Sequence, residues 1–215
     1  MERIWGKKSL PFTASELHTQ MALYHHCLID IGTGDGRFVQ HTAYQRPEWF
    51  CIGVDACREN LQKTSRKAPV NVIFLIASAQ TLPAALNRLT HRITINFPWG
   101  SLLESLLVSD PALLNGLEKL AQNEAKLEIR LNGGALANAG WSLETGAEMV
   151  RQNLCLAGWN IQIAANLVSQ DLLLFPSTWA RRLAFGRDPR AILLSGQRIP
   201  IARSVESAAF AHSAD

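Results

Sequence analysis

Three glycines at alternate positions follow a short apolar segment near the start of the chain. Residues 28–31 (Leu-Ile-Asp-Ile) have the character of a buried strand, with Asp30 near its carboxyl end, and Gly32, Gly34 and Gly36 come directly after it. A strand that breaks into a glycine-rich turn and opens a helix forms a crevice where α/β sheets bind ligands. Glycine lets a ligand approach the backbone because it has no Cβ. This stretch therefore predicts a ligand site.

The spacing of the glycines and the charges around them indicate which ligand. Dinucleotide-binding turns have the pattern G-x-G-x-x-G, whereas here the sixth position is Arg37, and no Lys-Ser/Thr pair follows as a Walker loop requires. Asp30 and Asp35 would repel a pyrophosphate but suit an ammonium group. S-adenosylmethionine (SAM), which has a zwitterionic methionine end, a sulfonium and no phosphate, fits these residues. An ordinary glycine turn between a strand and a helix is the alternative interpretation.

A second acid lies about 20 residues beyond the glycines, at the spacing expected of a ribose-binding carboxylate. Residues 50–55 (Phe-Cys-Ile-Gly-Val-Asp) form another short apolar segment, and Asp55 ends it. A carboxylate at the end of that strand can accept hydrogen bonds from both hydroxyls of an adenosine ribose. Asp55 thus strengthens the prediction of SAM as the cofactor.

Length and composition bound the classes of protein that these residues can belong to. The 215 residues are 47% hydrophobic and 18% charged, which predicts one soluble α/β domain with insertions. A net charge of +3 permits a nucleic-acid partner without requiring one. The four cysteines form no CxxC pair and no histidine has metal-ligand spacing, so we expect reduced thiols, no metal and a cytoplasmic protein. No apolar run has the length of a signal peptide or of a membrane span.

Alternating strand and helix patterns must position these residues. Apolar runs at 70–77, 92–97, 126–131, 161–167 and 191–195 add five expected strands to the two described above, which predicts a doubly wound sheet of seven strands. We expect a helix at 80–89 despite Pro83, and a turn at 132–134. The predicted organisation is a hairpin and helix extension over 1–27, one domain over 28–198, and a disordered tail over 199–215.

Two further segments make the prediction more specific. Residues 96–104 read Asn-Phe-Pro-Trp-Gly-Ser-Leu-Leu-Glu, and residues 177–187 read Ser-Thr-Trp-Ala-Arg-Arg-Leu-Ala-Phe-Gly-Arg. Together with Asp-Ile-Gly-Thr-Gly-Asp-Gly at 30–36, they resemble the aminoglycoside-resistance methyltransferases of 16S ribosomal RNA, typified by KamB and NpmA, that modify N1 of an adenine in the decoding site. The resemblance runs from about residue 6 to residue 197. It implies a class I SAM-dependent methyltransferase fold, Rossmann-like, with helices on both faces of a seven-stranded sheet and a short N-terminal extension.

The resemblance also implies roles for individual residues. Asp30, Gly32 and Asp55, with Gly34 in the same loop, would contact the methionine and ribose parts of SAM. Its adenine would lie against Ala79 and Gln80, with Ser101 nearby. The residues that match the family's target site are Trp99 and Trp179, which would stack on the two faces of a flipped-out adenine, and Lys63, Arg66, Lys67, Arg182 and Arg187, which would bind RNA phosphates. The implied partner is 16S rRNA within the assembled small ribosomal subunit, bound by a monomer without a membrane.

The chemistry of this reaction is compatible with the residues present. An enzyme that modifies a base must take it out of its stack, and stacking on an aromatic side chain is worth ~1–3 kcal/mol per base. Adenine N1 carries an in-plane lone pair and no proton, so its methylation needs no general base. Tryptophans are more often core residues, as we expect for Trp141 and Trp159. Lys63, Arg66 and Lys67 could instead form a solvated helix face.

The chain departs from the family at several places, and two other functions remain open. Gln80 stands where the family commonly has an acid, the linkers that carry basic residues are shorter, and Asp188-Pro189 interrupts a basic run. Asn96-Phe97-Pro98-Trp99 also resembles the [DN]-P-P-[YF] motif that methylates exocyclic amines, which would make the product N6-methyladenine or another methylated base. The other alternative is a SAM-binding ribosome factor without catalysis.

Overall fold

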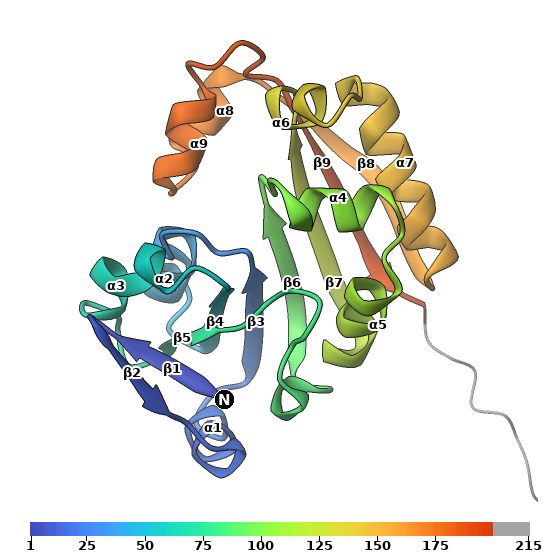
Figure 1. The fold of residues 1–215 in the computed structure, drawn as a ribbon. Coiled ribbons are helices and arrows are strands. Elements are labelled where there is room, and N and C mark those ends of the chain that lie inside the picture. The colour runs from blue at the N-terminus through green and yellow to red at the C-terminus, as the bar shows by residue number, and fades with distance from the viewer. Residues whose placement is uncertain (200–215) are drawn as a thin grey trace, which may run out of the picture.

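The computed structural model describes residues 1–199, which fold around one mixed β-sheet of nine strands (Figure 1). The strands are β1 (Glu2–Trp5), β2 (Lys8–Pro11), β3 (His26–Ile31), β4 (Trp49–Asp55), β5 (Val72–Ile76), β6 (Thr90–Asn96), β7 (Ala121–Asn132), β8 (Trp159–Leu167) and β9 (Ala191–Arg198). The helices are α1 (Ala14–Met21), α2 (Arg37–Gln45), α3 (Arg58–Ser65), the 3-10 turn η1 (Ala84–Leu86), α4 (Ser101–Leu107), α5 (Pro111–Leu120), α6 (Gly133–Asn138), α7 (Leu143–Leu156), α8 (Ser169–Leu174) and α9 (Thr178–Leu183). The predicted tail lies outside the described residues, apart from residue 199.

The order of the strands creates a binding crevice at the carboxyl ends of the central strands. The order is β2-β1-β5-β4-β3-β6-β7-β9-β8, and β3 pairs in parallel with β4 on one side and with β6 on the other. The chain builds β4 and β5 outward from β3, and then returns to place β6 and β7 on the opposite side. Such a reversal is the point at which doubly wound sheets bind ligands, at the carboxyl ends of their strands.

The predicted fold class is confirmed, but the strand count of seven is wrong. Seven strands, β3 to β9, form the doubly wound part, and the N-terminal hairpin adds β1 and β2 to the same sheet. Strand β1 pairs antiparallel with β5, where Glu2 lies opposite Ile76 and Arg3 opposite Leu75. The sequence predicts the hairpin, but nothing within the hairpin segment indicates that β1 pairs with β5.

Helices cover both faces of the sheet. One apolar core joins the sheet to α1, α4, α5 and α7, and includes Leu17, Leu117 and Val150. The other face packs on α2 and α3 through Val39 and Leu61. These helices follow the apolar periodicity of their sequences. Helix α1 also has the capping box expected from its sequence, in which the Thr13 hydroxyl accepts from the Glu16 N–H and the Glu16 carboxylate accepts from the Thr13 N–H.

Two short segments differ from their predicted structure. Residues 80–89 contain only the turn η1 instead of a helix, because Pro83 disfavours helical geometry at the residue before it. Residues 132–134 begin helix α6 instead of ending in a turn, because the Asn132 side chain caps the helix by accepting from the Ala135 N–H at 3.2 Å. Both differences arise from local contacts that periodicity does not report.

Helices α8 and α9 form an insertion between β8 and β9 that the sequence patterns did not predict. Leu172 of α8, Ala180 of α9 and Ala184 just after α9 form a small apolar cluster with Phe97, which follows β6. The ring of Phe175, between the two helices, stacks on Phe38 of α2 with their centroids 5.2 Å apart. Figure 1 shows the pair, in orange, at the edge of the sheet where β6 and β7 end. The insertion therefore lies beside the predicted ligand crevice.

Candidate active site

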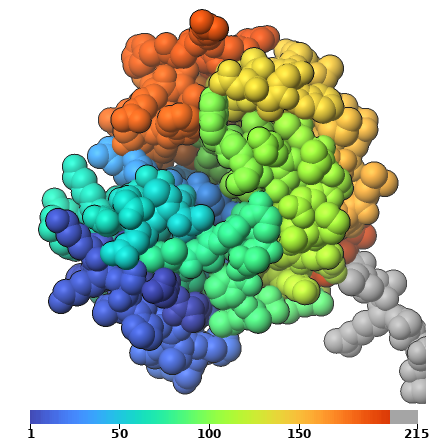
Figure 2. Space-filling view, in the orientation of Figure 1, coloured from blue at the N-terminus to red at the C-terminus, as the bar shows by residue number. Residues whose placement is uncertain are grey.

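A cavity of about 540 Å³ opens at the carboxyl ends of the central strands. Its walls come from the glycine loop after β3, the acid that ends β4, the segment after β5, the turn after β6 and the start of α9. Figure 2 shows the molecule hollowed where its cyan, green and orange segments meet. The predicted crevice is therefore present, and its size is within the ~300–1,000 Å³ range of small-ligand sites.

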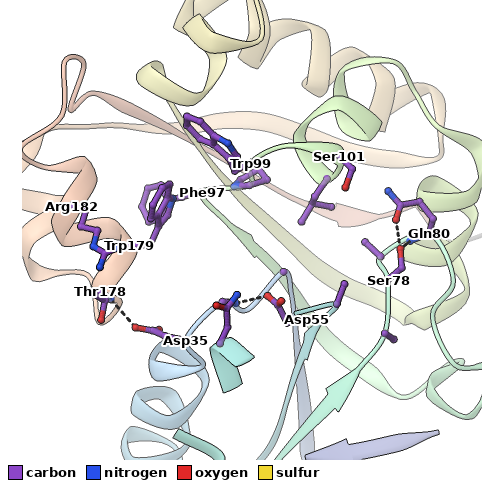
Figure 3. A pocket seen from close by; sticks show the side chains of 18 residues that line it. Asp35, Asp55, Ser78, Gln80, Phe97, Trp99, Ser101, Thr178, Trp179 and Arg182 are labelled. Atoms are coloured by element: carbon purple, nitrogen blue, oxygen red, sulfur yellow. Dashed lines mark hydrogen bonds between the residues drawn. The ribbon is translucent and has the colours of Figure 1, made fainter. Parts of the chain in front are cut away.

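The glycine loop and Asp55 form one side of the cavity (Figure 3). The Gly34 N–H donates to one carboxylate oxygen of Asp55 at 2.7 Å, and the Cys57 N–H donates to the other at 2.8 Å. Burial raises the pKa of Asp55, while these two hydrogen bonds act in the opposite direction. Each oxygen keeps a second lone pair, so the carboxylate can still accept from a pair of ligand hydroxyls.

The glycines leave backbone open to a ligand. Gly34 has φ +58°, a left-handed conformation that favours glycine, and an added Cβ there would meet no atom within 4 Å. At Gly32, with φ +66°, an added Cβ would lie 2.6 Å from a methyl carbon of Leu102. A side chain at either position would therefore fill space beside the cavity or displace a wall residue.

Asp30 lies beneath the loop. Its side chain is buried, and it accepts hydrogen bonds from the Thr94 hydroxyl at 2.6 Å and from the Asn96 amide at 2.8 Å. Burial raises the pKa of Asp30 to about 6, against these hydrogen bonds and the positive charge of Arg130. Asp30 is not among the residues that line the cavity. Its contact with the cofactor stays a prediction.

The side of the cavity after β5 has small and apolar side chains. Ala77 and Ala79 line it, beside Ser101 and Leu102 at the start of α4. The contact of the cofactor's adenine with Ala79, Gln80 and Ser101 stays a prediction. The amide of Gln80 is occupied within the protein, since its nitrogen donates to the Ser105 hydroxyl at 2.8 Å and its oxygen accepts from Ser78. An adenine could therefore lie flat between apolar groups, with Gln80 holding the wall in place.

Trp99 and Trp179 meet at the rim of the cavity, although 80 positions separate them in the sequence. Their ring centroids are 5.8 Å apart with an interplanar angle of 81°, and the two residues are 47% and 39% exposed. The turn that carries Trp99 is held by Phe97, whose N–H donates to the Arg130 carbonyl at 2.8 Å. The rings meet edge to face, so a flat base can enter between them only after one ring turns.

The predicted RNA-binding residues lie in different places. Arg182 lines the cavity beside Trp179, whereas Lys63 and Lys67 line a second cavity. Arg66 is exposed at the end of α3 with its stem near Gly6, and Arg187 is exposed beyond α9. The structure therefore brings one of the five cations to the predicted target site.

Sequence reasoning missed the residue that joins the glycine loop to α9. The Asp35 carboxylate accepts from the Thr178 N–H at 3.1 Å, and both residues line the cavity (Figure 3). Asp35 was noted only for its charge within the glycine motif. Its side-chain partner lies 143 positions away in the sequence, so no local signal could identify it.

The cavity fits SAM by the chemistry of its walls. Asp55 offers acceptors for ribose hydroxyls, the alanines offer a flat apolar surface, and the open glycine loop leaves room for the methionine end. Within residues 1–199, no group of three or more His, Cys, Asp or Glu side chains could hold a metal ion. None of the helices in this range is long and apolar enough to cross a membrane.

Comparison with known proteins gives one consistent result. A family model, NpmA, described as 16S rRNA (adenine(1408)-N(1))-methyltransferase, matches residues 2–198. A protein of that name from Escherichia coli is 32% identical over 212 residues, which cover 89% of this chain and 95% of that protein. Another from Streptoalloteichus hindustanus is 31% identical over 140 residues, which cover 61% of this chain and 64% of that protein.

Solved structures agree with the sequence comparison. The 16S rRNA methyltransferase KamB superposes with a TM-score of 0.82 at 26% identity, covering 93% of this chain and 100% of that chain. A mutant of the 16S rRNA (adenine(1408)-N(1))-methyltransferase from Catenulisporales acidiphilia, solved with cosubstrate SAM, has a TM-score of 0.84 at 25% identity. That match covers 95% of this chain and 100% of the other.

Proposed function

The chain belongs to the family of 16S rRNA (adenine(1408)-N(1))-methyltransferases, and on this premise we propose that its cavity methylates N1 of a flipped-out adenine in the decoding site of 16S rRNA. It is an enzyme, and SAM is its methyl donor. The observation that carries the proposed mechanism is the convergence of Trp99 and Trp179 at the rim of the cavity that Asp55 and the glycine loop enclose.

The protein's residues bind and orient the two reactants. SAM supplies an activated methyl group on its sulfonium. Asp55 accepts from the ribose hydroxyls, Ala79 packs against the adenine of the cofactor, and Gly34 lets the backbone approach the methionine end. Holding two reactants in line can lower a barrier by on the order of 7–11 kcal/mol. Such alignment of the reactants requires rigid cavity walls. Two backbone hydrogen bonds, one to each oxygen, hold the Asp55 carboxylate in position.

The aromatic rim holds the target base. Two stacking contacts of ~1–3 kcal/mol each can offset an unstacking cost of a few kcal/mol. N1 of adenine attacks with a lone pair that carries no proton, so the transfer needs no general base. The cavity is compatible with this, because its titratable wall residues in the described chain are Asp35, Asp55 and Arg182. Backbone N–H groups donate to both carboxylates and hold them in position.

The competing reaction at an exocyclic amine is disfavoured by the position of Asn96. In that reaction the Asn side chain must accept from the target amino group. Here the Asn96 nitrogen donates to Asp30 at 2.8 Å, and its oxygen accepts from the Arg130 guanidinium at 2.9 Å. Neither Asn96 nor these partners line the cavity. A catalytic role would require this partly buried network to break.

We further propose that the enzyme acts as a cytoplasmic monomer on the assembled small ribosomal subunit. Arg182 at the cavity and Arg187 a short distance beyond it supply positive charge for the RNA backbone, and Lys63 and Lys67 extend it. Methylation of the decoding-site adenine would add a positive charge and a methyl group where aminoglycosides bind. Resistance to kanamycin and apramycin is the expected consequence.

The test uses purified small ribosomal subunits, radiolabelled SAM and identification of the methylated nucleoside. Wild-type protein should give N1-methyladenine, whereas N6-methyladenine would favour the alternative reaction and no product would favour a non-catalytic factor. Trp99→Ala or Trp179→Ala should lose about 1–3 kcal/mol of stacking, which is up to about a hundredfold in rate. Trp→Phe at either position should retain more activity, because stacking needs a flat ring and not the indole N–H.

Trp5 provides the matched control for these variants. This residue of β1 is 43% exposed, and it lines neither of the two cavities. Trp5→Ala should therefore leave the methylation rate unchanged. Full activity in Trp179→Ala would contradict the stacking role, and a collapse of its melting temperature would indicate that Trp179 supports the fold instead.

A further inference from the structure

A mostly buried arginine lies behind the active-site cavity, in contact with the turn after β6 and with the α8–α9 insertion. Arg130 is near the end of β7, its side chain is 15% exposed, and it is not among the residues that line the cavity. We propose that Arg130 is a positioning residue for the methyl transfer, which fixes the two tryptophans of the rim relative to each other and to Asp30. The proposal rests on the proposed function.

The guanidinium group of Arg130 sets the orientation of Asn96. It donates to the Asn96 side-chain oxygen at 2.9 Å. Because a guanidinium can only donate, the oxygen of the amide must face Arg130 and the nitrogen must face away from it. That nitrogen donates to Asp30 at 2.8 Å. Arg130 therefore acts through Asn96 on the side chain that lies beneath the glycine loop.

The backbone of Arg130 holds the turn that carries Trp99. Its carbonyl accepts from the Phe97 N–H at 2.8 Å. Phe97 has φ +54°, a left-handed conformation that is uncommon for a residue with a bulky side chain. Such a conformation costs free energy and persists only where the surrounding structure enforces it. The hydrogen bond to Arg130 is one of these restraints, and it acts two residues before Trp99.

The side chain of Arg130 also reaches the insertion that carries Trp179. Its guanidinium carbon lies 5.2 Å from the ring centroid of Phe175, within the range of a cation–π contact. The rings of Phe175 and Phe97 meet edge to face, with centroids 5.2 Å apart and an interplanar angle of 87°. This pair has nearly the same arrangement as the tryptophan pair of the rim, and each phenylalanine is within four residues of the tryptophan on its own segment. Arg130 therefore contacts the base of both segments that form the rim.

Neutralising a buried carboxylate is the common reason for an arginine inside a protein, and Arg130 is not needed for it. Its ion-pair partner is Glu128 at 3.4 Å, but the same carboxylate accepts two hydrogen bonds from the Arg92 guanidinium, both at 2.7 Å. The hydrogen bonds of the Arg92 guanidinium within residues 1–199 all go to Glu128. The two arginines share one partner and differ in their contact with the active-site walls, so Arg92 provides the matched control.

The experiment compares Arg130→Met with Arg92→Met and adds Arg130→Lys as the conservative variant. Methionine keeps much of the apolar stem and removes the charge and the donors, and in Arg130→Met the Glu128 carboxylate still has Arg92. Methylation of purified small ribosomal subunits at saturating SAM gives kcat and KM, and melting temperature reports stability. Each protein is also labelled with 5-fluorotryptophan. The fluorine resonances of its six tryptophans, assigned by Trp→Phe substitutions, then report the surroundings of Trp99 and Trp179.

Arg130→Met should lower kcat by on the order of tenfold to a hundredfold, the scale of a misplacement of about 1 Å between reactants. The KM for subunits should match wild type, because the exposed residues that meet the RNA are unchanged. The fluorine resonances of Trp99 and Trp179 should shift or broaden, whereas Arg92→Met should leave kcat and both resonances at their wild-type values. Arg130→Lys should have an intermediate kcat, because an ammonium group keeps the charge but lacks the planar set of donors.

A general loss of stability would lower kcat in both methionine variants, so an equal loss in Arg92→Met would overturn the proposal. Wild-type kcat in Arg130→Met would overturn it as well. If Arg130→Met does not fold, Arg130→Lys takes its place in both comparisons, and the same two outcomes overturn the proposal.

The fluorine resonances do not depend on methyl transfer, so this proposal and the proposed function fail in different ways. Wild-type protein that transfers no methyl group would contradict the proposed function, and the resonances of Trp99 and Trp179 in Arg130→Met would still support or overturn the positioning role. Wild-type protein that methylates subunits, with wild-type kcat and unchanged resonances in Arg130→Met, would overturn the positioning role alone.

Discussion

Asp55 has two tasks that depend on the same carboxylate. Its oxygens fix the glycine loop through the Gly34 N–H and face the cavity as acceptors. Asp55→Ala should therefore weaken SAM binding by about 1.5–3 kcal/mol, the scale of hydrogen bonds to charged groups, as measured by calorimetry. Glu59→Ala is the control, because this exposed acid on α3 does not line the cavity. Unchanged SAM affinity in Asp55→Ala would remove the residue from the site.

Asp30 should make the stability of the protein depend on pH. Its pKa is raised from the usual 3.8 to about 6 by burial, so between these values the folded state binds more protons than the unfolded state. The free energy of unfolding must then fall as pH rises from about 4 to about 6. At 1.36 kcal/mol per pKa unit, the shift of Asp30 lowers the free energy of unfolding by about 3 kcal/mol over this pH range.

Asp30→Asn cannot ionise, so it isolates this contribution. Denaturant unfolding of wild type and variant at pH 4 and pH 7 should show wild type losing up to about 3 kcal/mol relative to the variant. Other titrating groups cancel in that comparison. A constant difference between the two proteins across this range would mean that Asp30 has an ordinary pKa in the folded state.

At the scale of elements, α9 is positioned by a residue outside it. This short helix carries Trp179 and Arg182, and the Asp35 carboxylate accepts from its first N–H. Asp35→Ala should leave that N–H without its acceptor, and hydrogen exchange across residues 177–183 should become faster. The KM for subunits should rise. Asp35→Asn keeps an acceptor oxygen, so it should restore most of the slow exchange and of the low KM. Equal exchange in wild type, Asp35→Ala and Asp35→Asn would show that α9 is held by its apolar contacts alone.

The sequence predicted most elements of the doubly wound sheet but neither helix of the insertion. The strands around Asp30 and Asp55 are apolar runs bounded by glycine or acid, a pattern that periodicity detects. Helices α8 and α9 are six residues each, too short for a periodic signal, and they are stabilised by contacts with Phe97 and Phe38. The glycine loop and the tryptophan pair were predicted from motifs. The second cavity was not, although its residues Lys63 and Lys67 were predicted to bind RNA, because its walls come from segments far apart in the chain.

At the scale of the whole molecule, the N-terminal hairpin belongs to the sheet that holds the site. Ile4 is buried in one apolar cluster with Leu28, Val39 and Phe74, which joins the hairpin to the first strand of the doubly wound part and to α2. The Gly6 N–H donates to the Ser65 hydroxyl at 3.0 Å at the end of α3. Strand β5, which leads into the cavity wall at Ala77 and Ala79, therefore has β1 as its outer partner instead of solvent.

This arrangement predicts that two apolar residues of the hairpin differ in their effect on stability. Ile4→Ala should leave a cavity in the core and lower the free energy of unfolding by about 2–5 kcal/mol, because the Ile4 side chain is 1% exposed. Leu10→Ala, on β2, should cost no more than about 0.5 kcal/mol, because Leu10 is 43% exposed. Urea unfolding monitored by tryptophan fluorescence measures both in one transition if the hairpin and the sheet unfold together. Equally small effects of the two substitutions would mean that the hairpin is an appendage, and that the edge of β5 is stable without it.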